Sequence, residues 1–112
     1  MHYHENADEF FYVVEGAMTF KVGDDIKRIG NSGFVWIPRT VVHGFLINSD
    51  VSRFLFGFVP AGLEQLFIEA SSVASDPRNR PLVPAGSNRE QFRTIVVGPP
   101  LGEWLQNHAK DL

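Results

Sequence analysis

The segment 9–15, EFFYVVE, is apolar on both faces of the strand that it predicts. Side chains alternate along a strand with period two, so its two faces can be read from the sequence. One face carries Glu9, Phe11 and Val13, and the other carries Phe10, Tyr12 and Val14. A strand of this kind must be covered on both sides. We therefore expect a homodimer with Phe10 or Tyr12 at the contact.

Short β-prone runs separated by turn residues continue as far as residue 59. The segments 23–25 and 30–33 are rich in glycine and polar residues, as is typical of hairpin loops. Besides the strands at the two N-terminal histidines and at 9–15, we expect strands at 17–22, 26–29, 33–37, 42–47 and 51–59. This spacing predicts an all-β fold of antiparallel strands.

The pattern changes after Pro60. Leu63, Leu66, Phe67 and Ala70 recur at helical spacing, which predicts an amphipathic helix to about residue 71. Residues 71–89 contain three prolines and several serines without periodicity, which is typical of a loop.

The C-terminal part is predicted to return to regular structure. Residues 92–97 form an expected edge strand, and about 102–110 form a short helix anchored by Trp104 and Leu105. The chain is then a single domain of residues 1–112, with the strands over about 1–59 and a helix and C-terminal arm over about 60–112.

The composition excludes several classes of function. The net charge is −3 and the ten basic residues are spread thinly, so there is no electrostatic footprint for nucleic acid. The absence of cysteine excludes disulfides and thiolate chemistry. The sequence shows no apolar run long enough to cross a bilayer and no signal peptide. We expect a cytoplasmic protein that binds a small molecule and neither nucleic acid nor membrane.

Three of the four histidines and one carboxylate form a candidate metal site, made of His2, His4, Glu9 and His43. His2 and His4 share one face of a strand, and a turn or bulge at Glu5 to Asp8 can bring Glu9 to the same point. Imidazole and carboxylate ligands suit one divalent transition metal: iron, manganese, nickel, cobalt, copper or zinc. Calcium and magnesium are disfavoured because they prefer oxygen ligands.

Two stretches around these residues resemble the paired motifs of the cupin superfamily. They read His2-x-His4-x4-Glu9-x6-Gly16 and Gly33-x4-Pro38-x4-His43-x4-Asn48. The resemblance implies that residues of about 1–59 form a small antiparallel, jelly-roll-like cupin β-barrel, followed by one or two short C-terminal helices. It also implies that the two histidines of the first motif, the glutamate and His43 bind one metal.

The segments 60–67 (PAGLEQLF) and 98–101 (GPPL) resemble a narrower branch, the bacterial quercetin-2,3-dioxygenase-like cupins. That resemblance implies a mononuclear metal dioxygenase acting on a flavonol or another enolisable aromatic. In that branch the residue matching Glu9 is catalytic and takes the acidic proton of the substrate. The alternative role for Glu9 is that of a purely structural fourth ligand.

Two features depart from the family pattern. Thr40 stands where the second motif usually has glycine, a mild change if the turn does not require a positive φ. Only Met1 precedes His2, so strands that normally lie upstream are expected to be missing. The first strand would then lack support on one side. For this reason we expect His43→Ala to reduce metal binding more than His2→Ala.

An aromatic substrate pocket is predicted near the metal, formed by Phe45, Phe54, Phe56 and Phe58. The alternative is that these rings are plain core, which is also where we place Trp36. Two other functions remain open. One is a non-catalytic cupin that binds a metal or small ligand, and the other is a cupin isomerase. The apolar inward residues argue against a sugar isomerase.

Overall fold

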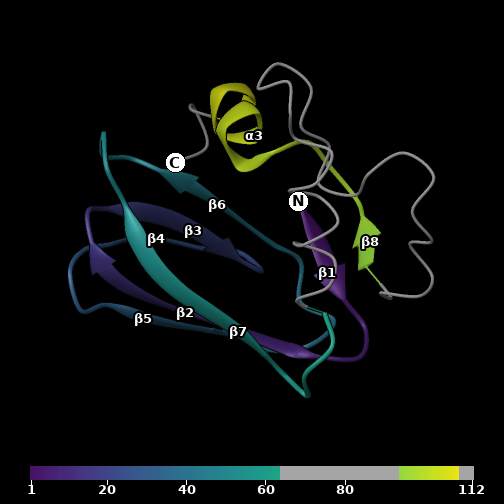
Figure 1. Ribbon diagram of the computed structural model, residues 1–112. Helices are drawn as coiled ribbons and strands as arrows, with labels where there is room; N and C mark the ends of the chain where they lie inside the picture. The colour runs from purple at the N-terminus through teal and green to yellow at the C-terminus, as the bar shows by residue number, and fades with distance from the viewer. Residues whose placement is uncertain (64–93, 109–112) are drawn as a thin grey trace, which may run out of the picture.

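The computed structural model describes residues 1–63 and 94–108. Two antiparallel sheets face each other, one of five strands in the order β4-β3-β6-β1-β8 and one of three in the order β5-β2-β7 (Figure 1). The strands are β1 His2–His4, β2 Asp8–Glu15, β3 Met18–Val22, β4 Asp25–Ile29, β5 Phe34–Ile37, β6 His43–Ile47, β7 Arg53–Val59 and β8 Thr94–Val96. The predicted all-β antiparallel fold is confirmed.

Strand positions follow from alternating side chains and short turns. β3 and β4 pair from Met18↔Ile29 to Val22↔Asp25, which leaves a two-residue connection. Gly23 in that connection has a φ of +59°, a value that glycine adopts without steric cost. The predicted strand ranges up to residue 59 agree with the structure to within two residues at each end.

The core lies between the inner faces of the two sheets. Its fully buried members are Phe11, Val13, Met18, Phe20 and Ile37. The ring of Phe11 on β2 lies 5.0 Å from that of Phe20 on β3, measured between ring centroids. The face of β2 that sequence parity assigned to the interior is therefore the buried one.

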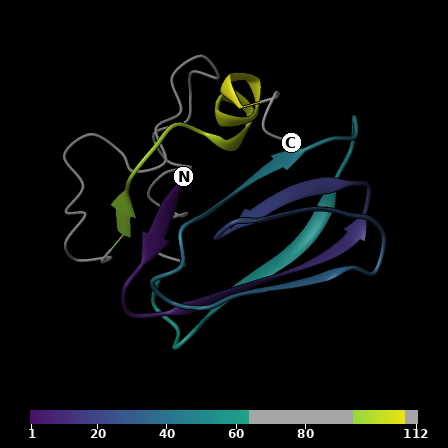
Figure 2. The same cartoon turned by 180° about the vertical axis from the view of Figure 1, so that it is seen from behind.

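β1 is supported on both of its edges. It pairs with β6 through His2↔His43, and with β8 through His2↔Val96, Tyr3↔Ile95 and His4↔Thr94. Figures 1 and 2 show β8 beside β1 from opposite sides. The expectation that β1 lacks support on one side is therefore wrong, because a strand from the C-terminal part of the chain takes that place. The expected difference between His2→Ala and His43→Ala loses its basis.

One short helix, α3 at Leu101–Asn107, packs against β6 and agrees with the predicted C-terminal helix. Leu101 is its buried residue, and the ring of Trp104 lies 4.9 Å from the Lys21 ammonium nitrogen. The helix predicted to end at about residue 71 and the loop at 71–89 lie outside the described residues, apart from Leu63. Within those described residues, no helix has the length and apolar character needed to span a membrane.

One local expectation is wrong, and the condition under which Thr40 would be a mild change is not met. Trp36 was placed in the core, but 44% of it is exposed, because its parity on β5 points it away from the interior that Val35 and Ile37 face. Thr40 adopts a φ of +71°, so the turn before β6 does require the left-handed region that favours glycine.

Candidate metal centre

The four predicted ligands converge from three strands and both sheets. His2 and His4 lie on one face of β1, and the pairing of β1 with β6 places His43 opposite His2. The chain then turns at Glu5 and Asn6 and passes from the five-stranded sheet into β2 of the other sheet. Glu9 therefore faces the histidines across the interior instead of standing beside them.

The ligand atoms of these four residues all lie within 4.8 Å of one another, and all four side chains are buried. Nε2 of His4 is 3.1 Å from Oε2 of Glu9, and Nε2 of His43 is 2.9 Å from the same oxygen. Two ligand atoms held about 2.0–2.1 Å from one metal at a right angle lie about 3 Å apart. The spacing therefore fits donors that share a single transition-metal ion.

Hydrogen bonds on the far side of two rings set their orientation. The Nδ1–H group of His43 donates to the carbonyl oxygen of Val41 at 2.9 Å. Nδ1 of His4 lies 2.9 Å from Oγ1 of Thr94, which is buried. Partners of this kind fix the ring and leave Nε2 free to serve as the ligand atom.

Thr94 is a residue of this site that the sequence did not reveal. It lies 90 positions from His4 and belongs to none of the motif residues. Its segment was expected only to form an edge strand. A lone threonine there carries no signal until the pairing of β8 with β1 is known.

The electrostatics of the site favour the forms that bind metal. Burial, together with the neighbouring His43 and His4, lowers the pKa of His2 to about 3. Burial alone would raise the pKa of Glu9, but its hydrogen bonds to His4 and His43 outweigh that effect and lower the pKa to about 2. A neutral imidazole and an ionised carboxylate are the forms that coordinate a metal.

The donor set also selects among metals. Three nitrogens and one carboxylate suit a first-row transition metal, whereas calcium and magnesium prefer oxygen ligands throughout. These residues fit the metal that the sequence predicts. Only 2% of Glu9 is exposed, and burying an ionised carboxylate is costly. A metal ion bound by the four residues would offset that cost.

The four phenylalanines of the predicted pocket form a row that leads from the metal cluster into the core. Phe58 lies edge-on to His4, with ring centroids 5.6 Å apart. Phe56 follows at 6.2 Å from Phe58, while Phe54 and Phe45 pack against Phe11 of the core. Phe58 is thus the member that lies directly beside the ligands, and the pocket itself stays a prediction.

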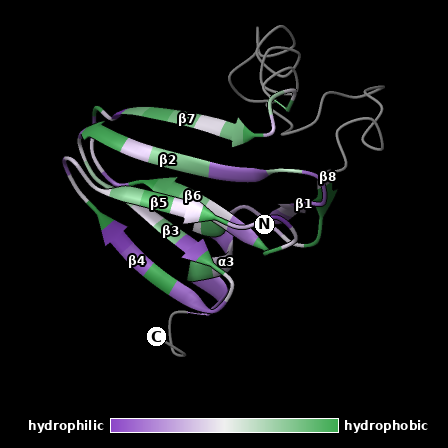
Figure 3. Ribbon diagram, turned by 90° about the horizontal axis from the view of Figure 1, so that it is seen from below, coloured by the Kyte–Doolittle hydropathy of each residue, from purple (hydrophilic) through white to green (hydrophobic). Residues whose placement is uncertain are grey.

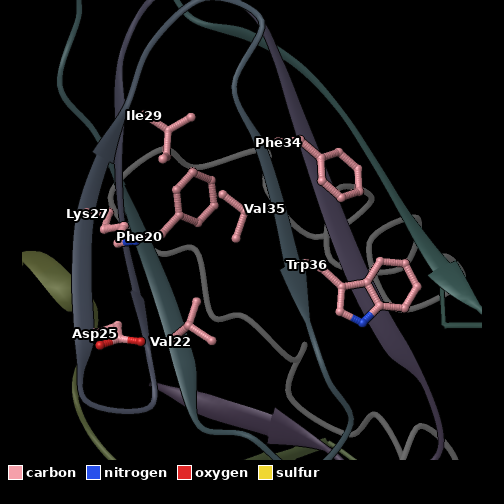
Figure 4. A pocket seen from close by; sticks show the side chains of 8 residues that line it. All are labelled: Phe20, Val22, Asp25, Lys27, Ile29, Phe34, Val35 and Trp36. Carbon is pink, nitrogen blue, oxygen red and sulfur yellow. The ribbon is translucent and has the colours of Figure 1, made fainter.

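A separate groove of about 250 Å³ lies between β4 and β5 and contains none of the four ligands. Figure 4 shows Phe20, Val22, Ile29 and Val35 along it, with Asp25 and Lys27 on β4. Its lining is mainly apolar. It therefore offers packing surface and no set of metal ligands.

Comparison with known proteins adds two findings. A cupin domain model matches residues 1–58, more than half of the 112-residue chain. Quercetin 2,3-dioxygenase of Bacillus subtilis (strain 168) is 30% identical over 95 residues, which cover 85% of this chain and 27% of that protein. The chain thus spans about a quarter of the length of this relative.

Proposed function

The chain belongs to the cupin family, and on that premise we propose that it is a metal-dependent dioxygenase of the quercetinase type. His2, His4, Glu9 and His43 would hold one divalent transition metal. The substrate would be a flavonol or another enolisable aromatic. The observation that carries the proposal is the buried cluster of three histidines and one glutamate with ligand atoms within 4.8 Å.

The metal would supply a Lewis acid for the enol oxygen of the substrate and a route for electrons to dioxygen. The residues of the chain supply position and exclusion of water. Thr94 and the Val41 carbonyl orient two histidine rings, and the edge of Phe58 covers His4 on one side. In the overall reaction, one dioxygen molecule enters the flavonol ring, which opens with loss of carbon monoxide.

Glu9 can act as a ligand or as the base that accepts the enol proton. A base works best with a pKa near the working pH, whereas the pKa of Glu9 is lowered to about 2. The low value means that the carboxylate is ionised at neutral pH before a metal binds, which suits the role of a ligand. With a metal bound, Nε2 of His4 and His43 would be ligands and would no longer hydrogen-bond to the carboxylate, so this low pKa belongs to the metal-free site.

Absorption spectroscopy with quercetin tests the proposal. Protein loaded in turn with nickel, cobalt, manganese and iron is mixed with quercetin without oxygen, and a red shift of the quercetin band is expected. Admitting air should then bleach the band and release carbon monoxide. His43→Ala serves as the control that lacks one ligand. No spectral change with any of these metals would overturn the proposal.

A second candidate is a non-catalytic cupin that binds a metal and a small ligand. The same buried cluster supports it, because holding a metal needs only these four ligands and no proton acceptor. The same experiment separates the two functions. A red shift that persists in air without bleaching would indicate binding alone.

A further inference from the structure

The outer face of the three-stranded sheet is a continuous apolar surface. Its strand register sets Trp36, Phe10 and Gly57 in one row and Phe34, Tyr12 and Leu55 in the next. Figure 3 shows hydrophobic stretches on β7, β2 and β5, with a hydrophilic stretch at one end of β2. We call this surface the aromatic face; it comprises Phe10, Tyr12, Val14, Phe34, Trp36, Leu55, Gly57 and Val59.

Two rings of the aromatic face are aligned with each other. The rings of Phe10 and Trp36 are nearly parallel, 3° apart, with centroids 6.2 Å from each other. A Cβ atom added to Gly57 would lie 2.5 Å from Cζ of Phe10, so the missing side chain lets that ring rest on the sheet. Apolar side chains on the face of a sheet are what a second sheet can pack against.

From these observations we propose that the aromatic face is the interface of a two-fold homodimer, in which two copies pack face to face. The alternation of side chains in the sequence pointed only to the outward residues of β2, Phe10, Tyr12 and Val14. The structure adds β5 and β7 to it, including the side chain of Trp36 that the sequence placed in the core. The proposal does not depend on metal binding.

The size of the surface supports a second copy. Phe34 is 58% exposed and Leu55 is 63% exposed. With comparable exposure at Tyr12, Val14, Trp36 and Val59, side chains of this size leave roughly 500–600 Å² of apolar surface. A monomer rarely shows a larger patch, and a stable complex buries about 800 Å² on each partner. The adjoining groove beside β5 can supply the remainder, as Figure 4 shows with Phe34 and Trp36 across β5 from Val35.

The charges at the rim are compatible with self-association. At one end of β2, Arg39 Nε lies 3.2 Å from Asp8 Oδ1, and at the other end Arg53 Nε lies 3.5 Å from Glu15 Oε2. Each end thus carries one acid and one base. Whichever way a two-fold axis runs in the plane of the face, an acid of one copy can lie opposite a base of the other.

Light scattering and sedimentation on the whole chain test the interface. The wild type is expected to be a dimer at micromolar concentration. The double variant Phe34→Glu/Leu55→Glu should raise the dissociation constant at least about 100-fold, because it places charges in a buried apolar contact. The matched control is Ile95→Glu, a similar change at a 36% exposed strand residue in the other sheet. It should leave the dimer intact.

Fluorescence gives a second measurement on the same face. The chain has two tryptophans, so Trp104→Phe leaves Trp36 as the sole reporter. Dilution through the dissociation constant should expose Trp36 to a soluble quencher, while circular dichroism confirms that the charged variants stay folded. A wild-type monomer would overturn the proposal. A dimer that survives the double variant would overturn it too.

Discussion

The two sides of β2 contrast with each other. On the inner side, Glu9 is a buried carboxylate held between two histidines. On the outer side, Tyr12, three positions further along the strand, belongs to an exposed apolar surface. A single strand therefore carries a charged group inward and aromatic rings outward, the reverse of the usual arrangement.

Each side departs from the usual arrangement in a way that points to a partner. A buried ionised group is costly unless it is paired or bound to a metal, and Glu9 has both histidines as partners. An exposed apolar patch is costly unless it is covered. We therefore propose an ion as the partner of the inner side and a second copy of the chain as the partner of the outer side. Substitutions on the two sides should change different properties.

The largest expected effect comes from Glu9→Gln, which keeps the shape of the side chain and removes its charge. Metal affinity should fall by more than about 100-fold, above the range for groups that only orient a ligand. Isothermal titration with zinc or cobalt measures it. Phe10→Leu, one residue along on the outer side, is the control and should bind metal as the wild type does. A similar loss in both variants would break the distinction between the two sides.

Thr94→Val should have the next largest effect, because it removes the hydroxyl that positions His4 and keeps the side-chain volume. The expected loss of metal affinity is about 10–100-fold, with recovery in Thr94→Ser. Nitrogen NMR shifts of the His4 ring report its tautomer directly, which a change in packing alone would not alter. If valine and serine variants bind metal equally well, the hydroxyl does not position His4.

The metal-free protein should become less stable as the pH is lowered. The pKa of His2 is about 3 in the folded protein, against an ordinary 6.5, so between these values only the unfolded chain gains the proton. Stability is thus lost as the pH falls from 6.5 to 3, at up to about 1.4 kcal/mol per pH unit. The pKa of Glu9 is lowered to about 2, so its contribution is present above its ordinary 4.5 and is lost towards pH 2.

Urea unfolding in the presence of a chelator, at pH 7, 6, 5 and 4, measures this slope. His2→Gln removes the titrating ring and should flatten the curve above pH 5. Tyr12→Phe, on the outer side, should keep the wild-type slope. A His2→Gln curve as steep as that of the wild type would contradict the assignment.

The smallest effect is expected for Thr40→Gly. A residue other than glycine in the left-handed conformation destabilises the folded state by about 1–2 kcal/mol. Glycine removes this strain, but it loses about 0.5–1 kcal/mol more conformational entropy on folding. The variant should therefore be more stable by up to about 1 kcal/mol in thermal unfolding. The amide of Thr40 donates to the carbonyl oxygen of His4, and glycine keeps that bond. Thr40→Ala is the comparison and should gain less.

Much of the fold and the ligand set could be predicted from the sequence because they follow from local rules. Period two assigned the buried face of β2, the shared face of His2 and His4, and the outward stripe. The ligand types alone predicted a transition metal. The prediction for Trp36 was wrong, because an apolar residue on a strand does not reveal which side of its sheet is covered.

Tertiary structure decided what depends on distant segments. The pairing of β8 with β1, and with it the bond from Thr94 to His4, joins residues 90 positions apart, and no periodicity links them. The passage of the chain between sheets at Glu5 and Asn6 placed Glu9 opposite the histidines. The turn before β6 forced Thr40 into a conformation that its residue type disfavours. Local preference fixes which face of a strand is apolar, whereas long-range pairing fixes what that face meets.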